Sequence, residues 1–322
     1  MTIRSLVLLL ASSLVVTLSA AELRVGMIGL DTSHVTAFTG ILHDPKAKDF
    51  VPGAKVVAGF KGGSPDIESS WSRVGEYTKT LQEKFGVTIY DSIPELCRHV
   101  DVVMIESVDG RPHLEQLKPV LAAKKPVYLD KPVAGTLRDA LEVYRLANEA
   151  RVPVFSASSL RFAKNTLAVR GGAIGTVTNA WCGSPAHLEK THPDLFWYGV
   201  HGCESLFTVM GTGCLSVKRG TSANGKIEVV GKWAGGRTGT FREVEGYKGR
   251  AEGTKGAMDV GAYDGYAPLV AAVVKFYETG IAPVSPQETI EIFAFMEAAD
   301  ESKRRGGAEV TLAEVIAKAR QK

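Results

Sequence analysis

The sequence is poor in cysteine and carries no excess of charge of either sign. Its 322 residues include four cysteines, too few and too scattered for a disulfide framework, and none forms the CxxC pair of a structural zinc site. Lys and Arg total 38 and Asp and Glu 35, a net charge of +3 that, without a basic stripe, argues against nucleic-acid binding. The hydrophobic share of 45% excludes a disordered chain, and the length predicts two domains.

Long hydrophobic runs are also missing, apart from one at the N-terminus. Residues 1–21 hold one basic residue, Arg4, then an apolar run from Leu6, then small residues up to Ala21. This is the pattern of a cleavable signal peptide, and the run is short for a membrane span. We therefore expect a mature protein that begins near Glu22, without a membrane span, in the periplasm or outside the cell. A retained N-terminal anchor is the alternative. No twin-arginine pair precedes the run, which indicates export of an unfolded chain.

Short apolar segments alternate with helical patterns through residues 22–156. The predicted strands are 23–29, 55–60, 87–90, 101–105, 126–129 and 152–155. Strands separated by helices at this spacing are joined by right-handed crossovers and form a doubly wound parallel sheet. The sequence therefore predicts an α/β fold whose N-terminal domain is a Rossmann-type nucleotide-binding domain.

Residues 157–322 follow a different pattern. Residues 175–181 read as a strand, and 213–263 are rich in Gly, Thr and Val with few helix signals. Ser285 and Glu288 form a capping box that opens a long helix near the end of the chain. We expect a C-terminal α+β domain with an open, largely antiparallel sheet.

Five segments, in this order along the chain, carry a resemblance to a known family. They read DVVMIESVDGRPH, KPVYLDKP, RFAKNTLAVRGGAIGTV, GVHGCE and SPQETIEIFAFMEAADESKRRGGAEVTL. Together they resemble the glucose–fructose oxidoreductase and inositol dehydrogenase family, Gfo/Idh/MocA, over nearly all of the mature chain. Two acids are exchanged relative to the family motifs, because Asp130 stands for a Glu and Glu204 for an Asp.

The resemblance implies an oxidoreductase that moves a hydride between a tightly held nicotinamide cofactor and a hydroxyl of a sugar or cyclitol. Such a reaction needs a general base beside the hydroxyl proton. Lys131 follows the fifth strand at the carboxyl edge of the sheet and matches the family's active-site lysine. His201 matches the histidine that hydrogen-bonds the reacting hydroxyl. The family often has an Asp four residues before this histidine; Trp197 stands there, so Lys131, His201 and Tyr198 all remain candidates for proton transfer.

The segment before His201 combines aromatic and polar side chains, which suits a sugar ring. The residues that we expect to contact substrate are Arg161, His192, Asp194, Trp197 and Glu204. His-x-Asp is not a specific metal spacing, so we expect no metal among them. The family also implies a homo-oligomer formed through the open sheet of the second domain.

The first turn departs from the family's Gly-x-Gly-x-x-Gly dinucleotide motif, since its register reads Gly29-Leu-Asp-Thr-Ser-His34. Asp31 stands where pyrophosphate would approach, although Thr32, Ser33 and the amides of the helix start remain available to a phosphate. With Asp130 and Lys131, these are the expected cofactor residues. After the second strand, Lys61 stands where NAD-binding proteins have an acid, which favours NADP slightly over NAD.

These departures leave a second interpretation open. A chain exported unfolded does not carry a nucleotide with it, and only Gly29 of the glycine motif survives. The alternative is therefore a carbohydrate-binding protein, or a lyase- or hydrolase-type enzyme, on the same fold with an eroded nucleotide site.

Overall fold

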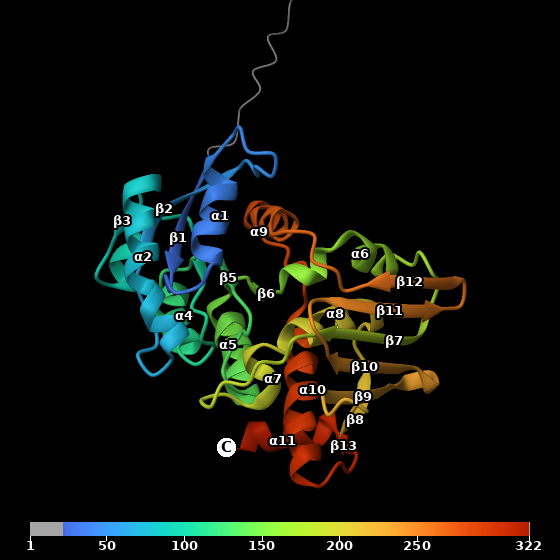
Figure 1. The fold of residues 1–322 in the computed structure, drawn as a ribbon. Helices are drawn as coiled ribbons and strands as arrows, with labels where there is room; N and C mark the ends of the chain where they lie inside the picture. Colours follow the sequence, from blue (N-terminus) through green and yellow to red (C-terminus); the bar gives the residue numbers. More distant parts are fainter. Residues whose placement is uncertain (1–21, 322) are drawn as a thin grey trace, which may run out of the picture.

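The computed structural model describes residues 22–321, and the expected signal peptide lies outside them. The N-terminal domain is a parallel sheet of six strands in the order β3-β2-β1-β4-β5-β6 (Figure 1). Its strands are β1 (Leu23–Ile28), β2 (Ala54–Phe60), β3 (Thr88–Ile89), β4 (Val102–Ile105), β5 (Val127–Leu129) and β6 (Val154–Ser156). The predicted Rossmann-type sheet is therefore confirmed.

Five helices connect these strands. They are α1 (His34–His43), α2 (Glu68–Phe85), α3 (Ile93–Arg98), α4 (His113–Ala122) and α5 (Leu137–Ala150). Two of these helices, α3 and α5, begin directly after an N-cap residue. The Ser92 hydroxyl accepts a hydrogen bond from the Glu95 backbone N–H, and the Thr136 hydroxyl accepts one from the Asp139 backbone N–H. Each crossover delivers the next strand parallel to the last, so the loops that follow all six strands gather at one edge.

The C-terminal domain is built on a mixed, mostly antiparallel sheet in the order β12-β11-β7-β10-β9-β8-β13. The β7–β10 pair is parallel and the other pairs are antiparallel. The strands are β7 (Val177–Ser184), β8 (Cys214–Thr221), β9 (Ile227–Trp233), β10 (Thr238–Glu243), β11 (Lys248–Gly253), β12 (Gly256–Val260) and β13 (Val310–Thr311). The expected open, largely antiparallel sheet is thus present, with one parallel pair.

The second half of the chain also contains helices and two short 3-10 turns. They are η1 (Ser159–Phe162), α6 (Lys164–Arg170), α7 (Asp194–Trp197), α8 (Val200–Met210), η2 (Ala234–Gly236), α9 (Ala267–Thr279), α10 (Pro286–Arg304) and α11 (Leu312–Gln321). The Ser285 hydroxyl accepts the Glu288 N–H at the start of α10, as the capping box predicts.

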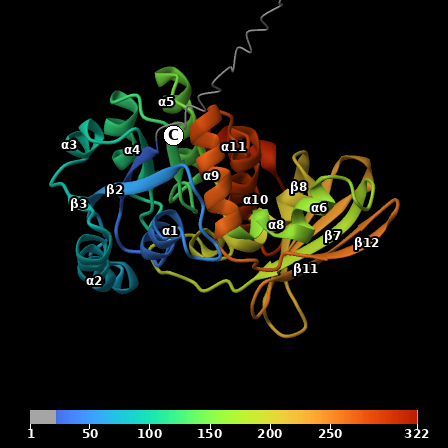
Figure 2. The ribbon, with the colours of Figure 1, turned by 90° about the horizontal axis from the view of Figure 1, so that it is seen from above.

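Helix α9 joins the two domains. Its Val273 and Phe276 share a buried apolar cluster with Met27 of β1 and Phe38 of α1, and Figure 2 shows α9 lying close to α1. The Tyr277 hydroxyl donates a 2.7 Å hydrogen bond to the Val103 carbonyl of β4. The C-terminal half of the chain therefore supplies part of the core of the first sheet, which fixes how the two domains meet.

Two other expectations concern cysteine and membrane spans. The four cysteines are buried free thiols. Among the helices within residues 22–321, none combines the length and hydropathy that a membrane crossing requires.

Candidate active site

A cavity of about 320 Å³ lies where the carboxyl edge of the first sheet meets the second domain. Its lining comes from the loop after β1, from α2, from the ends of β4 and β5, and from loops and helix α8 of the second domain. The lining residues are Thr32, Ser33, His34, Arg73, Val108, Lys131, Ser159, Leu160, Tyr198, His201, Tyr247, Tyr263 and Tyr266. The volume and the mixture of aromatic and polar walls suit a small polyhydroxylated ligand.

Lys131 enters the cavity from the end of β5 and is 7% exposed. Its Nζ lies 3.9 Å from the Asp130 Oδ2 and makes no hydrogen bond with residues 22–321. The Asp130 carboxylate is fully buried. Burial raises its pKa, but the charges of His34 and Lys131 outweigh that effect and hold the pKa well below its usual range. Asp130 is therefore an anion that anchors the ammonium of Lys131 beside the cavity.

His201 enters the same cavity from the first turn of α8. Its Nδ1 lies 2.8 Å from the Ser158 hydroxyl, which fixes the ring. Burial lowers the pKa of His201 well below its usual value, and the charges of Lys131 and His34 lower it further. The ring is therefore neutral at pH 7, with one nitrogen as a donor and the other as an acceptor. The structure thus brings the two strongest candidates for proton transfer, Lys131 and His201, to one cavity.

Tyrosines form much of the remaining wall. The Tyr198 hydroxyl lies 3.0 Å from the Tyr247 hydroxyl, and its ring meets His201 edge-on at 5.2 Å. Tyr263 and Tyr266 contact each other at 5.3 Å between ring centroids. Sequence reasoning singled out Tyr198 and missed the other three, because they lie 46 to 65 residues beyond His201 in a stretch without a motif.

The residues expected to contact substrate lie elsewhere. Arg161 is buried between Glu204 and Glu288, and its Nε donates a 2.8 Å hydrogen bond to the Glu204 Oε2. Because both carboxylates already pair with this guanidinium, Arg161 and Glu204 join η1, α8 and α10 instead of facing the cavity.

The other three expected substrate residues also have protein partners. The His192 Nε2 lies 3.1 Å from the Asp109 Oδ1, and Trp197 packs against the His192 ring at 5.0 Å. The Asp194 Oδ2 accepts hydrogen bonds from Arg219 at 2.5 Å and Lys303 at 2.7 Å. None of these side chains lines the cavity of Lys131 within the described chain.

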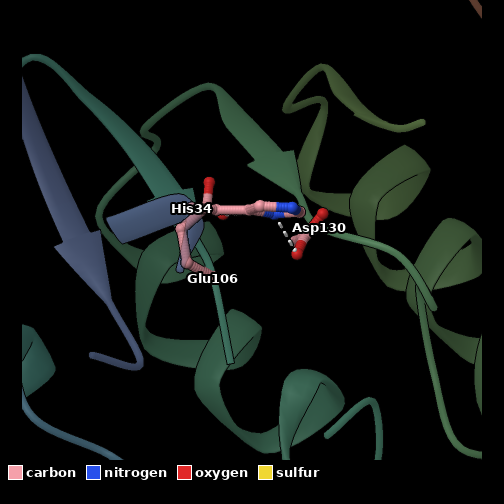
Figure 3. Close-up of side chains that lie close together, drawn as sticks. All are labelled: His34, Glu106 and Asp130. Atoms are coloured by element: carbon pink, nitrogen blue, oxygen red, sulfur yellow. Dashed lines mark hydrogen bonds and ion pairs between the residues drawn. The ribbon is translucent and has the colours of Figure 1, made fainter. Parts of the chain in front are cut away.

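A buried polar cluster borders the cavity on the side of the first domain (Figure 3). The His34 Nδ1 lies 2.8 Å from the Asp130 Oδ2 and 3.7 Å from the Glu106 Oε2. Burial opposes the charge on His34, but Asp130 outweighs it and raises the His34 pKa to about 9. Burial raises the Glu106 pKa to about 8. Sequence reasoning missed Glu106, although an acid directly after the apolar strand DVVMI was a visible signal.

In the turn after β1, where a Rossmann domain holds pyrophosphate, side chains form hydrogen bonds with other parts of the protein. Gly29 has a φ of +83°, and a Cβ there would lie 2.1 Å from the Ser107 Oγ, so glycine is required for packing. Asp31 is fully buried, where it accepts a 2.5 Å hydrogen bond from Ser70 and a 3.0 Å bond from the Val108 N–H. Thr32 and Ser33 line the cavity, and the Ser33 side chain does not cap α1. The start of α1 therefore still faces the cavity.

The loops after β2 and β4 are also bonded to each other across the end of β1. The Ser64 hydroxyl donates a 2.6 Å hydrogen bond to the Asp109 Oδ2, and Arg111 forms two hydrogen bonds with Asp66, at 2.8 and 2.9 Å. Lys61, in the same loop, lies outside the Lys131 cavity, in a separate hollow with Trp71 and Gln82.

Comparisons with known proteins identify the N-terminal domain. Residues 23–158 match the family model GFO_IDH_MocA, described as an oxidoreductase family with an NAD-binding Rossmann fold. The N-terminal domain is therefore similar to the NAD-binding domain of the Gfo/Idh/MocA oxidoreductase family. A search of curated proteins found no match to the chain.

Solved structures share the fold of both domains of this chain. A probable dehydrogenase from Thermotoga maritima is 20% identical, with a TM-score of 0.72 over 91% of this chain and 100% of that one. A scyllo-inositol dehydrogenase from Lactobacillus casei, solved with NAD(H) and scyllo-inositol, is 14% identical, with a TM-score of 0.70 over 91% and 100%. An oxidoreductase from Agrobacterium radiobacter, in complex with NAD⁺, L-tartaric acid and magnesium, is 17% identical, with a TM-score of 0.68 over 92% and 100%. At these identities the likeness extends to the fold.

The residues at the carboxyl edge of the first sheet fit one part of an NAD molecule and not the other. In Rossmann folds the dinucleotide lies along the carboxyl edge, with a ribose at the end of β2 and pyrophosphate at the start of α1. Thr32 and Ser33 at the start of α1 face the cavity and fit the pyrophosphate, and Lys131 faces the same cavity on the nicotinamide side. On the adenosine side, the hydrogen bonds from Ser64 to Asp109 and from Arg111 to Asp66 join the loops after β2 and β4. While these loops are joined, this edge does not fit a whole dinucleotide.

Proposed function

We propose that this protein is an exported oxidoreductase of the Gfo/Idh/MocA family that transfers a hydride between a nicotinamide nucleotide and a hydroxyl-bearing carbon of a sugar or cyclitol. The observation that carries the proposal is the convergence of Lys131 and His201, from two domains, on one cavity. The family is one of oxidoreductases, which supports redox chemistry at this place. The cavity of about 320 Å³ has room for one sugar-sized ring beside these two side chains.

The two side chains divide the work on the substrate hydroxyl. His201 is neutral, so its acceptor nitrogen takes a proton without first losing one. The ammonium of Lys131, held by Asp130, stabilises the negative charge that develops on the oxygen. Tyr198, whose ring contacts the His201 ring and whose hydroxyl pairs with that of Tyr247, is the alternative group for proton transfer.

For the nucleotide, we propose NADP in preference to NAD. Lys61 follows β2, where the ribose-recognition residue of a Rossmann domain lies, and no acid stands between Phe60 and Ser64. A lysine contact to a 2′-phosphate contributes about 1–3 kcal/mol, or about five- to a hundredfold in affinity. We therefore expect Lys61→Ala to weaken NADP binding by about that factor in calorimetric titration and to leave NAD binding unchanged. Equal loss for both nucleotides would remove Lys61 from the site.

Export is part of the proposal because the Leu6 run ends in small residues up to Ala21. We expect the mature protein to begin at Glu22, or at Ala21 if cleavage falls one residue earlier, and N-terminal sequencing of envelope protein measures this directly. Met1 or Thr2 at the start of the soluble envelope protein would contradict export by a cleaved signal. We also propose a homo-oligomer through the open sheet of β7 to β13.

The bonded loops favour a second candidate. Because the Ser64–Asp109 contact closes the adenosine side, a protein that never opens this contact would use Lys131 and His201 for acid–base chemistry without a nucleotide. It would then be a lyase- or hydrolase-type enzyme, or a carbohydrate-binding protein.

The two candidates separate in one assay. The purified mature protein is mixed with NADP or NAD and a panel of sugars and cyclitols, and the absorbance of reduced nicotinamide is followed. Substrate-dependent formation of reduced nicotinamide is the expected result. Binding of a sugar by calorimetry, without binding of either nucleotide, would replace the first candidate by the second.

A further inference from the structure

The ends of three neighbouring strands bring together an unusual set of buried side chains. His34 begins α1 after β1, Glu106 directly follows β4, and Asp130 directly follows β5. One ligand atom from each lies within 4.8 Å of the others. Imidazole and carboxylate groups are the nitrogen and oxygen ligands that first-row divalent ions prefer.

Glu106 is the member of this set that the protein leaves unsatisfied. It is fully buried, and neither of its carboxylate oxygens has a hydrogen-bond partner among residues 22–321. A buried carboxyl group without a partner is costly whether it is charged or neutral. The group is aimed at His34 and Asp130, as Figure 3 shows, so a cation between the three would satisfy it.

The separations are close to those of an ion site. Two ligand atoms that each lie about 2.1 Å from one ion are about 3.0 Å apart in octahedral and 3.4 Å in tetrahedral geometry. The His34 Nδ1 is 2.8 Å from the Asp130 oxygen and 3.7 Å from the Glu106 oxygen, which brackets these values.

The imidazole is also held in place by packing. The His34 ring stacks on Phe38 at 4.9 Å with an interplanar angle of 8°, and Tyr266 of the second domain meets it edge-on at 4.9 Å. A ring fixed in this way presents Nδ1 to the carboxylates without losing further rotamer freedom on binding.

We propose that His34, Glu106 and Asp130 bind one divalent cation, Zn²⁺ or Mn²⁺, beside the cavity of Lys131 and His201. Three protein ligands leave coordination positions open, as in catalytic metal sites, and His34 lines the cavity. An oxygen of a polyhydroxylated ligand therefore reaches the ion at the same time as Lys131. His34 and Glu106 release their protons to solvent when the ion binds, because only the deprotonated groups are ligands. The two carboxylates then balance the charge of the ion, and Lys131 remains as the net positive charge at this edge. The proposal stands on these residues alone and does not depend on hydride transfer.

Binding of the ion alone tests this site. The mature protein is stripped with a chelator, and Zn²⁺ and Mn²⁺ are titrated by calorimetry, with metal content measured after dialysis. We expect one ion per chain, and a loss of at least about tenfold in affinity for Glu106→Gln and for Asp130→Asn. His99→Gln is the matched control, because His99 forms an exposed pair with Glu95 at 3.1 Å. The proposal would be overturned if the wild type bound no ion, or if Glu106→Gln and Asp130→Asn bound the ion as tightly as the wild type does.

A second measurement needs no variant. Crystals of the wild-type protein grown with Mn²⁺ are measured for anomalous scattering. We expect one peak between His34, Glu106 and Asp130. A structure without a peak there would show that His34 and Asp130 form a buried ion pair beside a neutral Glu106, and the metal site would be rejected.

Discussion

The Ser64 hydroxyl donates a 2.6 Å hydrogen bond to the Asp109 carboxylate, and this contact joins the loops on either side of β1. In a dinucleotide-binding Rossmann domain, the ribose and pyrophosphate run along this edge. We therefore expect that a nucleotide binds here only when the two loops separate. Binding of NADP should then depend on how easily Ser64 and Asp109 part.

Ser64→Ala is expected to tighten NADP binding. A hydrogen bond to a charged group contributes about 1.5–3 kcal/mol, so weakening the closed form raises the apparent affinity by roughly tenfold or more. Ser72→Ala is the matched control, because the Ser72 hydroxyl bonds only to the Glu68 carbonyl of its own helix within the described chain. Calorimetric titration of both variants measures the effect. An affinity for Ser64→Ala that is unchanged or weaker would show that the loop contact does not oppose the nucleotide.

Lys131→Met and His201→Ala are each expected to lower kcat by at least about a hundredfold, because a positioned acid–base group contributes about 10²- to 10⁴-fold. If the two act as one proton-transfer unit, the double variant should be little worse than either single one. Lys275→Met, on the exposed face of α9, is the control. Steady-state kinetics with the substrate found in the panel gives the rates. Near-normal turnover at either position would make that residue structural.

Asp109→Asn is expected to change stability with pH in a defined direction. Burial raises the Asp109 pKa, but contacts with His192, Arg111 and Ser64 outweigh it and lower the pKa well below its ordinary value. A lowered pKa stabilises the folded state above the unfolded value of about 3.9, and this contribution is lost as the pH falls below it. We expect the variant to lose about 2–3 kcal/mol at pH 7 and to approach the wild type in acid. Denaturant unfolding at several pH values measures this, and a difference that is constant with pH would contradict it.

Arg161→Met is expected to affect folding and to spare substrate affinity. The change leaves Glu204 and Glu288 buried without their guanidinium, which costs about 3–5 kcal/mol. Arg145→Met is the control, since its pairs with Glu142 and Glu149 are exposed and contribute at most about 1 kcal/mol. Thermal unfolding measures the stability of each variant, and steady-state kinetics on the folded protein gives KM. A raised KM for Arg161→Met at normal stability would return Arg161 to the substrate site.

The sequence predicts the first sheet well because each parallel strand is buried on both faces and reads as an apolar run, as DVVMI does before Glu106. Cap residues place helix starts equally well, as Ser92 and Thr136 show. The start of helix α2 at Glu68 is harder to predict from the sequence, because no cap side chain marks it.

The site is predicted less completely, because side-chain partners far apart in sequence decide which residues face the cavity. Lys131 and His201 are found by motif, and the fold brings them together. Glu204 is three residues beyond His201, yet it turns to Arg161, which lies 43 residues earlier. Residues three apart on a helix lie only about 60° apart around its axis, so the buried partner Arg161, and not the spacing in sequence, decides that Glu204 does not face the cavity.

The nucleotide content of the protein tests the central claim of hydride transfer most directly. Protein purified from its native envelope is denatured, and the released small molecules are identified by mass spectrometry beside the absorbance of the intact protein. We expect about one NADP(H) per chain, with a change in the reduced-nicotinamide absorbance on adding a sugar or cyclitol substrate. A protein that carries no nicotinamide nucleotide, and that binds neither NADP nor NAD when they are added, would contradict it.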